Sequence, residues 1–182
     1  FGMLEKAYEL LEELPVRNVV SWSALIAGYV KEGQAHEAFD CFEQMQREGL
    51  QPDEFTFTSI LQACGNIGIA DKGEQIHDEI ISRGMLGSDV VLGNALVDMY
   101  GKCRLLEEAQ DIFDKIEFHS NASWNAIIAA YTECGHDDNA IACFEQMQIE
   151  GFSPDAITLT CILKVCSMTR SIEKGEKIHD MI

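Results

Sequence analysis

Short polar side chains recur along this 182-residue sequence at intervals of 31 to 36 residues. Each carries a hydroxyl or an amide, so each can donate and accept hydrogen bonds without carrying charge. The series is Ser23, Thr58, Asn94, Asn125 and Thr160. A second series at the same intervals is rich in aspartate: Asn18, Asp53, Asp89, Ser120 and Asp155. The two series could read the polar edge of a ligand, although the same residue types also serve as helix N-caps.

Residues for other chemistry lack the spacing that such chemistry needs. The seven cysteines are an odd number and contain no CxxC pair, so we predict small apolar helix residues in a reducing compartment, with no zinc. No acid–base pair, Cys–His couple or phosphate loop recurs with usable spacing, and His77 and His179 read as packing or surface residues. We therefore expect neither an enzyme nor a protein with a cofactor.

The elements that must position the polar series are copies of one another. The string CFEQMQ occurs at 41–46 and again at 143–148, an offset of 102 residues. Residues 1–80 and 103–182 share 33 identities in 80 aligned positions without a gap, which indicates an internal duplication. The block divides further into units 19–53, 54–89, 90–120 and 121–155, of 35, 36, 31 and 35 residues. Residues 1–18 and 156–182 are then partial units.

Each unit reads as two helices. In the unit 19–53, Trp22, Leu25, Ile26 and Tyr29 form an apolar stripe with helical spacing, and Gly33 is a plausible left-handed stop. Ala38, Phe42 and Met45 mark the second helix, Gly49 ends it, and Pro52 leads into the next unit. One hairpin has too little core to stand alone. The predicted fold is an all-α solenoid of helical hairpins, a right-handed superhelix with a concave face.

At this level of detail the sequence resembles the pentatricopeptide repeat family, in its plant type that mixes P, L and S units. The P motifs are VVSWSALIAGYVKEG at 19–33 and NASWNAIIAAYTECG at 121–135. The L motif is EFTFTSILQACGNIG at 54–68, and the S motif is VVLGNALVDMYGKC at 90–103. The 35-36-31 length pattern belongs to the same resemblance, which covers the whole chain.

The resemblance implies binding of single-stranded RNA, about one base per unit, through the fifth and last residue of each unit. The pairs are Ser23/Asp53, Thr58/Asp89, Asn94/Ser120 and Asn125/Asp155, while Asn18 and Thr160 stand alone in the partial units. By family analogy they read 5′-G-N-C-U-3′, with Thr58/Asp89 left open. Each aspartate could accept from a base N–H, or orient the fifth residue through water. It could also be only an N-cap.

Two further positions take a role from the resemblance. The second residues of the units would sandwich the bases: Val20, Phe55, Val91, Ala122 and Ile157. Only Phe55 could stack, so the expected affinity per base is modest. Lys31 and Lys102, at the thirteenth position, would contact phosphates, and Glu133 departs from that pattern.

The net charge of −18 argues against nonspecific nucleic-acid binding. The first helices of the units hold three lysines and three acids, so we expect the excess acid on second helices and turns, as a solvated face. The acidity keeps a protein-binding scaffold open as the alternative function.

Wider expectations concern the context of the chain. No apolar run is long enough to cross a membrane, and the N-terminus does not read as a signal peptide, so we expect no membrane partner and no small-molecule substrate. The chain reads as a fragment of a longer array. The resemblance implies a mitochondrial or chloroplast location, and a parent that acts in RNA processing or C-to-U editing with editing-complex proteins.

Overall fold

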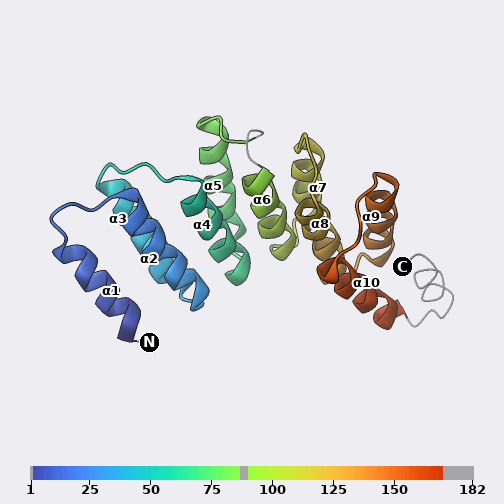
Figure 1. Cartoon of the computed structure of the whole chain (residues 1–182), viewed down its shortest axis with the longest axis horizontal. Helices are drawn as coiled ribbons and strands as arrows, with labels where there is room; N and C mark the ends of the chain where they lie inside the picture. The colour runs from blue at the N-terminus through green and yellow to red at the C-terminus, as the bar shows by residue number, and fades with distance from the viewer. Residues whose placement is uncertain (1, 87–89, 170–182) are drawn as a thin grey trace. The chain divides into compact units, whose positions relative to one another are not determined.

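The computed structural model describes residues 2–86 and 90–169, which form ten α-helices and no strand (Figure 1). The chain divides into two compact units, residues 1–86 and residues 87–182. The first holds α1 (Gly2–Glu13), α2 (Val19–Lys31), α3 (Ala35–Arg47), α4 (Glu54–Ile67) and α5 (Ala70–Ser82). The second holds α6 (Val90–Lys102), α7 (Leu106–Lys115), α8 (Asn121–Cys134), α9 (Asp137–Ile149) and α10 (Ala156–Thr169). This is the all-α solenoid of helical hairpins that the sequence predicts.

Neighbouring hairpins share their apolar faces. In the first unit α2 packs against both α3 and α4, and α4 packs against α5. In the second, α6 packs against α7 and α8, and α8 packs against α9 and α10. The helices α2, α4, α6, α8 and α10 begin at residues 19, 54, 90, 121 and 156, where the repeat places the start of each unit. These five are called the first helices below.

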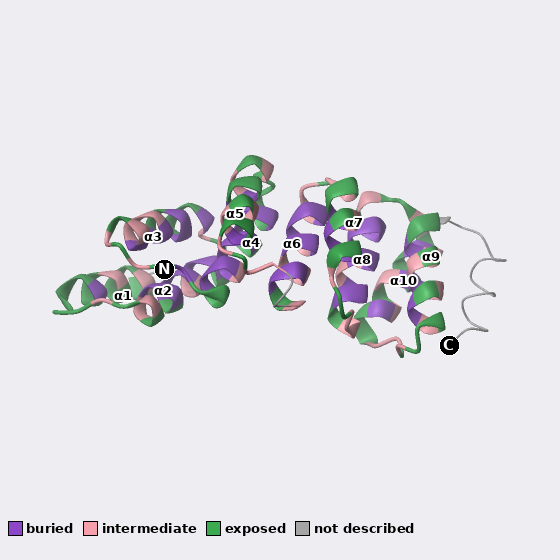
Figure 2. Ribbon diagram, turned by 90° about the horizontal axis from the view of Figure 1, so that it is seen from above, coloured by how far each residue is buried: buried purple, intermediate pink, exposed green. Residues whose placement is uncertain are grey.

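The core lies where the hairpins face one another, as the buried ribbon segments in Figure 2 show. Trp22, Phe42 and Phe57 are almost fully buried in the first unit, as Leu96 and Phe144 are in the second. Burial of such side chains stabilises the fold by about 1.5–3 kcal/mol each.

The first helices of the second unit approach one another closely at Gly101. A Cβ atom added to Gly101 would lie 2.4 Å from the Cβ of Ala130, so α6 and α8 could not keep their spacing with any larger residue there.

The turns inside the hairpins require left-handed backbone. Gly33 has φ 75°, which confirms the stop predicted there, and Arg104 adopts φ 63° at the matching turn between α6 and α7. The hydrogen bonds of the two turns correspond: Gly33 N donates to Val30 O at 3.0 Å, and Arg104 N donates to Gly101 O at 3.0 Å. Arg104 therefore takes a conformation that costs a non-glycine residue about 1–2 kcal/mol.

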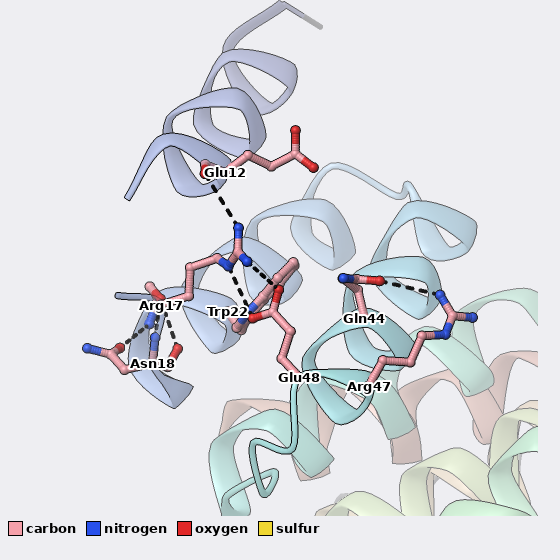
Figure 3. A network of polar contacts seen from close by, with 8 residues as sticks. Glu12, Arg17, Asn18, Trp22, Gln44, Arg47 and Glu48 are labelled. Atoms are coloured by element: carbon pink, nitrogen blue, oxygen red, sulfur yellow. Dashed lines mark hydrogen bonds and ion pairs between the residues drawn. The ribbon is translucent and has the colours of Figure 1, made fainter. Parts of the chain in front are cut away.

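A half-buried carboxylate ties the entry of α2 to the end of α3 (Figure 3). Glu48 accepts from Arg17 Nε at 3.1 Å and from the Trp22 indole Nε1 at 3.1 Å, and Arg17 Nη2 lies 2.9 Å from its other oxygen. Arg17 also donates to Glu12 O at 3.4 Å, which holds the end of α1.

The corresponding residues of the second copy are arranged differently. His119 takes the place of Arg17, stacks on Phe113 with centroids 4.2 Å apart, and keeps its Nδ1 3.8 Å from Glu150. The Nε1 of Trp124 is buried with no hydrogen-bond partner among the described residues. One network thus occurs in a complete and an incomplete form.

Candidate nucleic-acid interface

At four described positions, the last residue of a predicted unit caps the first helix of the next unit. In each case the backbone N–H of the third helical residue donates to it: Ser21 to Asn18 Oδ1 at 3.0 Å, Thr56 to Asp53 Oδ1 at 2.8 Å, Ser123 to Ser120 Oγ at 3.2 Å, and Thr158 to Asp155 Oδ1 at 3.1 Å. Such caps satisfy backbone donors that the helix cannot. The N-cap alternative is therefore true of these four residues, and Asp89 lies outside the described residues.

A capping carboxylate has a second oxygen that can accept another hydrogen bond. In one pair, this second oxygen of the cap residue accepts from the fifth residue of the unit. Asn125 Nδ2 donates to Asp155 Oδ2 at 2.8 Å, across the packed helices α8 and α10. The contact is direct rather than water-mediated. Hydrogen bonds from the Thr158 backbone N–H and from Asn125 hold the pKa of Asp155 below its ordinary value. The carboxylate is thus ionised and can act only as an acceptor.

The pair Ser23/Asp53 meets through a third side chain. Ser23 is 2% exposed, and its Oγ lies 2.6 Å from Thr56 Oγ1 and 2.7 Å from Val19 O. Thr56 Oγ1 in turn donates to Asp53 Oδ1 at 2.6 Å. The three side chains form one hydrogen-bonded line from α2 to the cap of α4.

Among the described residues, the other fifth residues show no such link to a cap. Asn94 makes no hydrogen bond to Ser120, and its Oδ1 is buried with no partner among the described residues. Thr58 and Thr160 each donate to a carbonyl of their own helix, Glu54 O at 2.8 Å and Ala156 O at 2.7 Å. Both therefore offer oxygen lone pairs rather than a free proton.

The third residue of the unit is a participant that the sequence reasoning missed. Its signal was present, because a hydroxyl stands at this position in four of the five first helices: Ser21, Thr56, Ser123 and Thr158. Thr158 Oγ1 donates to Asn125 Oδ1 at 2.5 Å, and both Thr56 and Thr158 are fully buried. The Thr56 and Thr158 hydroxyls thus connect the two series of polar residues.

The second residues present apolar surface beside these polar groups. Val20, Phe55, Val91 and Ile157 are between 56% and 73% exposed, and Ala122 is exposed as well. On each first helix the second and fifth residues lie about one turn apart, so an apolar side chain flanks every fifth residue. Exposed aliphatic and aromatic groups at a regular spacing suit flat apolar ligands.

The two lysines that are predicted to contact phosphates differ in how far their ammonium groups are exposed and paired. Lys31 is exposed at the end of α2. Lys102 is half-buried, and its Nζ donates to Asp98 Oδ2 at 2.7 Å one turn earlier in α6. Asp98 therefore offsets the positive charge that Lys102 brings to this face.

The part of the chain that the structure describes holds neither a metal-binding cluster nor a membrane-spanning helix. No three His, Cys, Asp or Glu side chains gather there to hold a metal ion, and no described helix is both long and apolar enough to cross a membrane. Burial raises the pKa of Cys41 to about 12 and that of Cys143 to about 11, so neither thiol is ionised at neutral pH.

Relatives with the same organisation confirm the family. A model of the PPR repeat family matches residues 17–66 and 119–168, and a PPR repeat model matches 55–85 and 94–119. A pentatricopeptide repeat-containing protein of Arabidopsis thaliana is 42% identical over 178 residues, 97% of this chain and 26% of its own length. The chloroplastic protein CRR2 of the same plant is 40% identical over 182 residues, 99% of this chain and 28% of its own length.

The chain thus spans only about a quarter of the length of these relatives. Among solved structures, the pentatricopeptide repeat protein PPR10 in complex with an 18-nt psaJ RNA element aligns with a TM-score of 0.79 at 19% identity. That alignment covers 96% of this chain and 27% of PPR10, and it shows a shared fold. Repeated helix pairs, family models and relatives agree, and the chain belongs to the pentatricopeptide repeat family.

Proposed function

We propose that the chain binds single-stranded RNA in a sequence-specific way, with about one base at each unit. The bases lie on the surface formed by the second and fifth residues of the first helices. The core that it reads is 5′-G-N-C-U-3′, assuming parallel polarity. The chain acts as a recognition module and not as an enzyme.

The observation that supports this proposal best is the Asn125/Asp155 pair. A neutral amide and an ionised carboxylate share a 2.8 Å hydrogen bond, and exposed apolar Ala122 and Ile157 stand on either side in sequence. After this bond and the one that its oxygen accepts from Thr158 Oγ1, the amide still has one N–H and one oxygen lone pair to offer. A planar base with one donor and one acceptor on its edge, held between two aliphatic side chains, satisfies both.

The decisive experiment measures binding of the chain to a fluorescent single-stranded RNA that contains 5′-GACU-3′ and to the same RNA with the core scrambled. We expect tighter binding of the former. Asn125→Ser should change the preferred base at the fourth position, while Asn139→Ser, an exposed position on α9, should not. Equal affinity for both RNAs would refute sequence-specific binding. Capture of a protein partner independently of RNA would favour the scaffold function.

The cellular role concerns the longer protein. Relatives in Arabidopsis thaliana are named chloroplastic in one case and mitochondrial in others. We propose that the parent protein acts in one of these organelles, where the chain directs an RNA-processing or C-to-U editing factor to its transcript. Fusion of the full-length parent to a fluorescent protein would identify the compartment.

A further inference from the structure

Two buried threonines stand between the residues proposed to contact the bases. Thr56 and Thr158 occupy the third position of α4 and α10 and have no exposed surface. A hydroxyl at this position could serve the helix alone, as part of its N-cap. Both hydroxyls do bond to their cap residues, Asp53 and Asp155, and in addition they reach across to the fifth residue of the preceding unit.

Thr158 determines which way the Asn125 amide faces. Its Oγ1 lies 2.5 Å from Asn125 Oδ1 and 3.2 Å from Asp155 Oδ1, so its single proton goes to the amide oxygen. Asn125 Nδ2 then points at Asp155 Oδ2. A reversed amide would set its oxygen against the carboxylate, two acceptors without a proton between them. The threonine and the aspartate together fix one orientation.

Thr56 has the corresponding effect on Ser23. Asp53 can only accept, so the Thr56 proton lies on the 2.6 Å bond to Asp53 Oδ1. The 2.6 Å contact between Ser23 Oγ and Thr56 Oγ1 then needs the Ser23 proton, which is shared with Val19 O 2.7 Å away, so this proton is used within the protein. Ser23 is left as a pure acceptor, which suits a base edge that presents N–H groups, as guanine does.

The serine at the same position of α8 provides the contrast. Ser123 Oγ accepts from Ser120 N at 3.1 Å and lies 3.1 Å from Ser120 Oγ, a closed capping box. It does not bond to Asn94, whose Oδ1 remains without a partner among the described residues. Ser123 therefore does not contact Asn94 in the way that Thr158 contacts Asn125.

We propose that Thr158 and Thr56 are positioning residues for base recognition. Each fixes the donor and acceptor directions of the preceding fifth residue, Asn125 or Ser23, and so sets which base edge that unit accepts. This role rests on the proposed function, because it has meaning only if the fifth residues contact bases. Where uracil carries a donor on its pairing edge cytosine carries an acceptor, and the reverse. An Asn125 amide that could rotate freely would bind either base and could no longer discriminate between them.

The test uses Thr158→Val, which keeps the shape of the side chain and removes the hydroxyl. Affinities are measured for two RNAs that differ only in the last core base, 5′-GACU-3′ and 5′-GACC-3′. We expect the U-over-C preference to fall by roughly threefold to tenfold, the range for loss of one hydrogen bond. Thr158→Ser should restore the preference. Thr132→Val should leave it unchanged, because Thr132 is buried in α8, is neither a second nor a fifth residue of its unit, and donates to Ile128 O of its own helix.

The ratio of the two affinities, measured on one variant, separates an effect on base recognition from an effect on stability, since partial unfolding weakens the binding of both RNAs equally. If Thr158→Val weakens the binding of both RNAs equally, so that the ratio of the two affinities is unchanged, Thr158 is only a capping residue and the proposal is wrong. If the unsubstituted chain binds neither RNA, the proposed function itself fails. Thr56→Val, read out as guanine over adenine at the first core base, repeats the test on a separate site of the chain.

Discussion

The complete and incomplete forms of the Glu48 network predict that two equivalent glutamates differ sharply in their contribution to stability. Glu48 and Glu150 are the same position of the duplicated block, and both are the C-cap residues of their helices, α3 and α9. Replacing either by alanine changes helix propensity and capping in the same way. The difference between Glu48→Ala and Glu150→Ala therefore isolates the contacts of the two carboxylates.

The expected magnitude follows from what each carboxylate contacts. Without Glu48, the indole N–H of Trp22, a residue 1% exposed, is left unpaired at a cost of about 1–3 kcal/mol. Loss of the ion pair to Arg17, whose side chain is 32% exposed, adds about 0.5–1 kcal/mol. We expect Glu48→Ala to lower the free energy of unfolding by about 2–3 kcal/mol.

The second glutamate should matter little. Glu150 has the 3.8 Å approach to His119 and an exposed hydrogen bond from Gln146 Nε2 at 3.1 Å, and the N–H of Trp124 has no partner among the described residues to lose. Glu150→Ala should change the free energy of unfolding by about 0.5 kcal/mol or less.

Urea denaturation followed by far-UV circular dichroism measures both variants, with the m-value used to check that the same surface unfolds. Equal destabilisation by the two substitutions would refute the reasoning, because it would mean that the contacts of Glu48 add nothing beyond its cap. His119→Arg offers a converse test: it should gain stability if the incomplete network can be completed.

Three further predictions concern the turn at Arg104, the charge at Lys102 and the carboxylate of Asp155. Arg104→Gly should raise the free energy of unfolding in urea by about 1 kcal/mol, because glycine adopts φ 63° without strain. Asp98→Asn should tighten RNA binding and steepen its salt dependence by about 0.7 in log–log slope, because Lys102 becomes free to contact a phosphate. Hydrogen bonds from the Thr158 N–H and from Asn125 lower the pKa of Asp155, so the folded state binds fewer protons than the unfolded state just below the ordinary aspartate range. The stability from Asp155 is thus present at neutral pH and lost as the pH falls through the lowered pKa, and Asp155→Asn should flatten this acid decline in urea titrations at several pH values.

Each of these three predictions would be contradicted by a specific result. Gly33→Ala, at the turn that matches Arg104, should destabilise, and a loss of stability in Arg104→Gly would contradict the strain argument. An unchanged salt slope in Asp98→Asn would show that Lys102 does not reach the RNA. An acid decline of the same steepness in Asp155→Asn would assign that decline to other carboxylates.

Much of the fold could be predicted because it depends on local, repeated patterns. The apolar stripe Trp22, Leu25, Ile26 and Tyr29 specifies a helix and its buried face within a few residues. Gly33 specifies a left-handed turn, and the duplication multiplies each signal. The exposure of the second residues follows from the same periodicity, because they lie away from the apolar stripe.

The candidate site was predictable in its positions but not in its contacts. The sequence places Ser23 and Asn125 at corresponding points of their helices, yet it does not say that one meets an aspartate through a threonine and the other directly. Nor does it say that Lys102 faces Asp98 in the rotamer that forms an ion pair. These contacts depend on the positions of side-chain atoms to within a few tenths of an ångström.

The sequence by itself determined the repeat, the helix pairs and the position of each polar residue along its own helix, because each of these needs only neighbours along the chain. The tertiary structure alone decided how Thr158 orients Asn125 across 33 residues, why Trp22 has a hydrogen-bond partner, and why Trp124 lacks one among the described residues. A hydrogen bond between two helices exists only when their packing brings a donor and an acceptor within about 3 Å. Packing is set by the whole interface, so two copies of one motif can fold alike and still differ in the bonds at their surfaces.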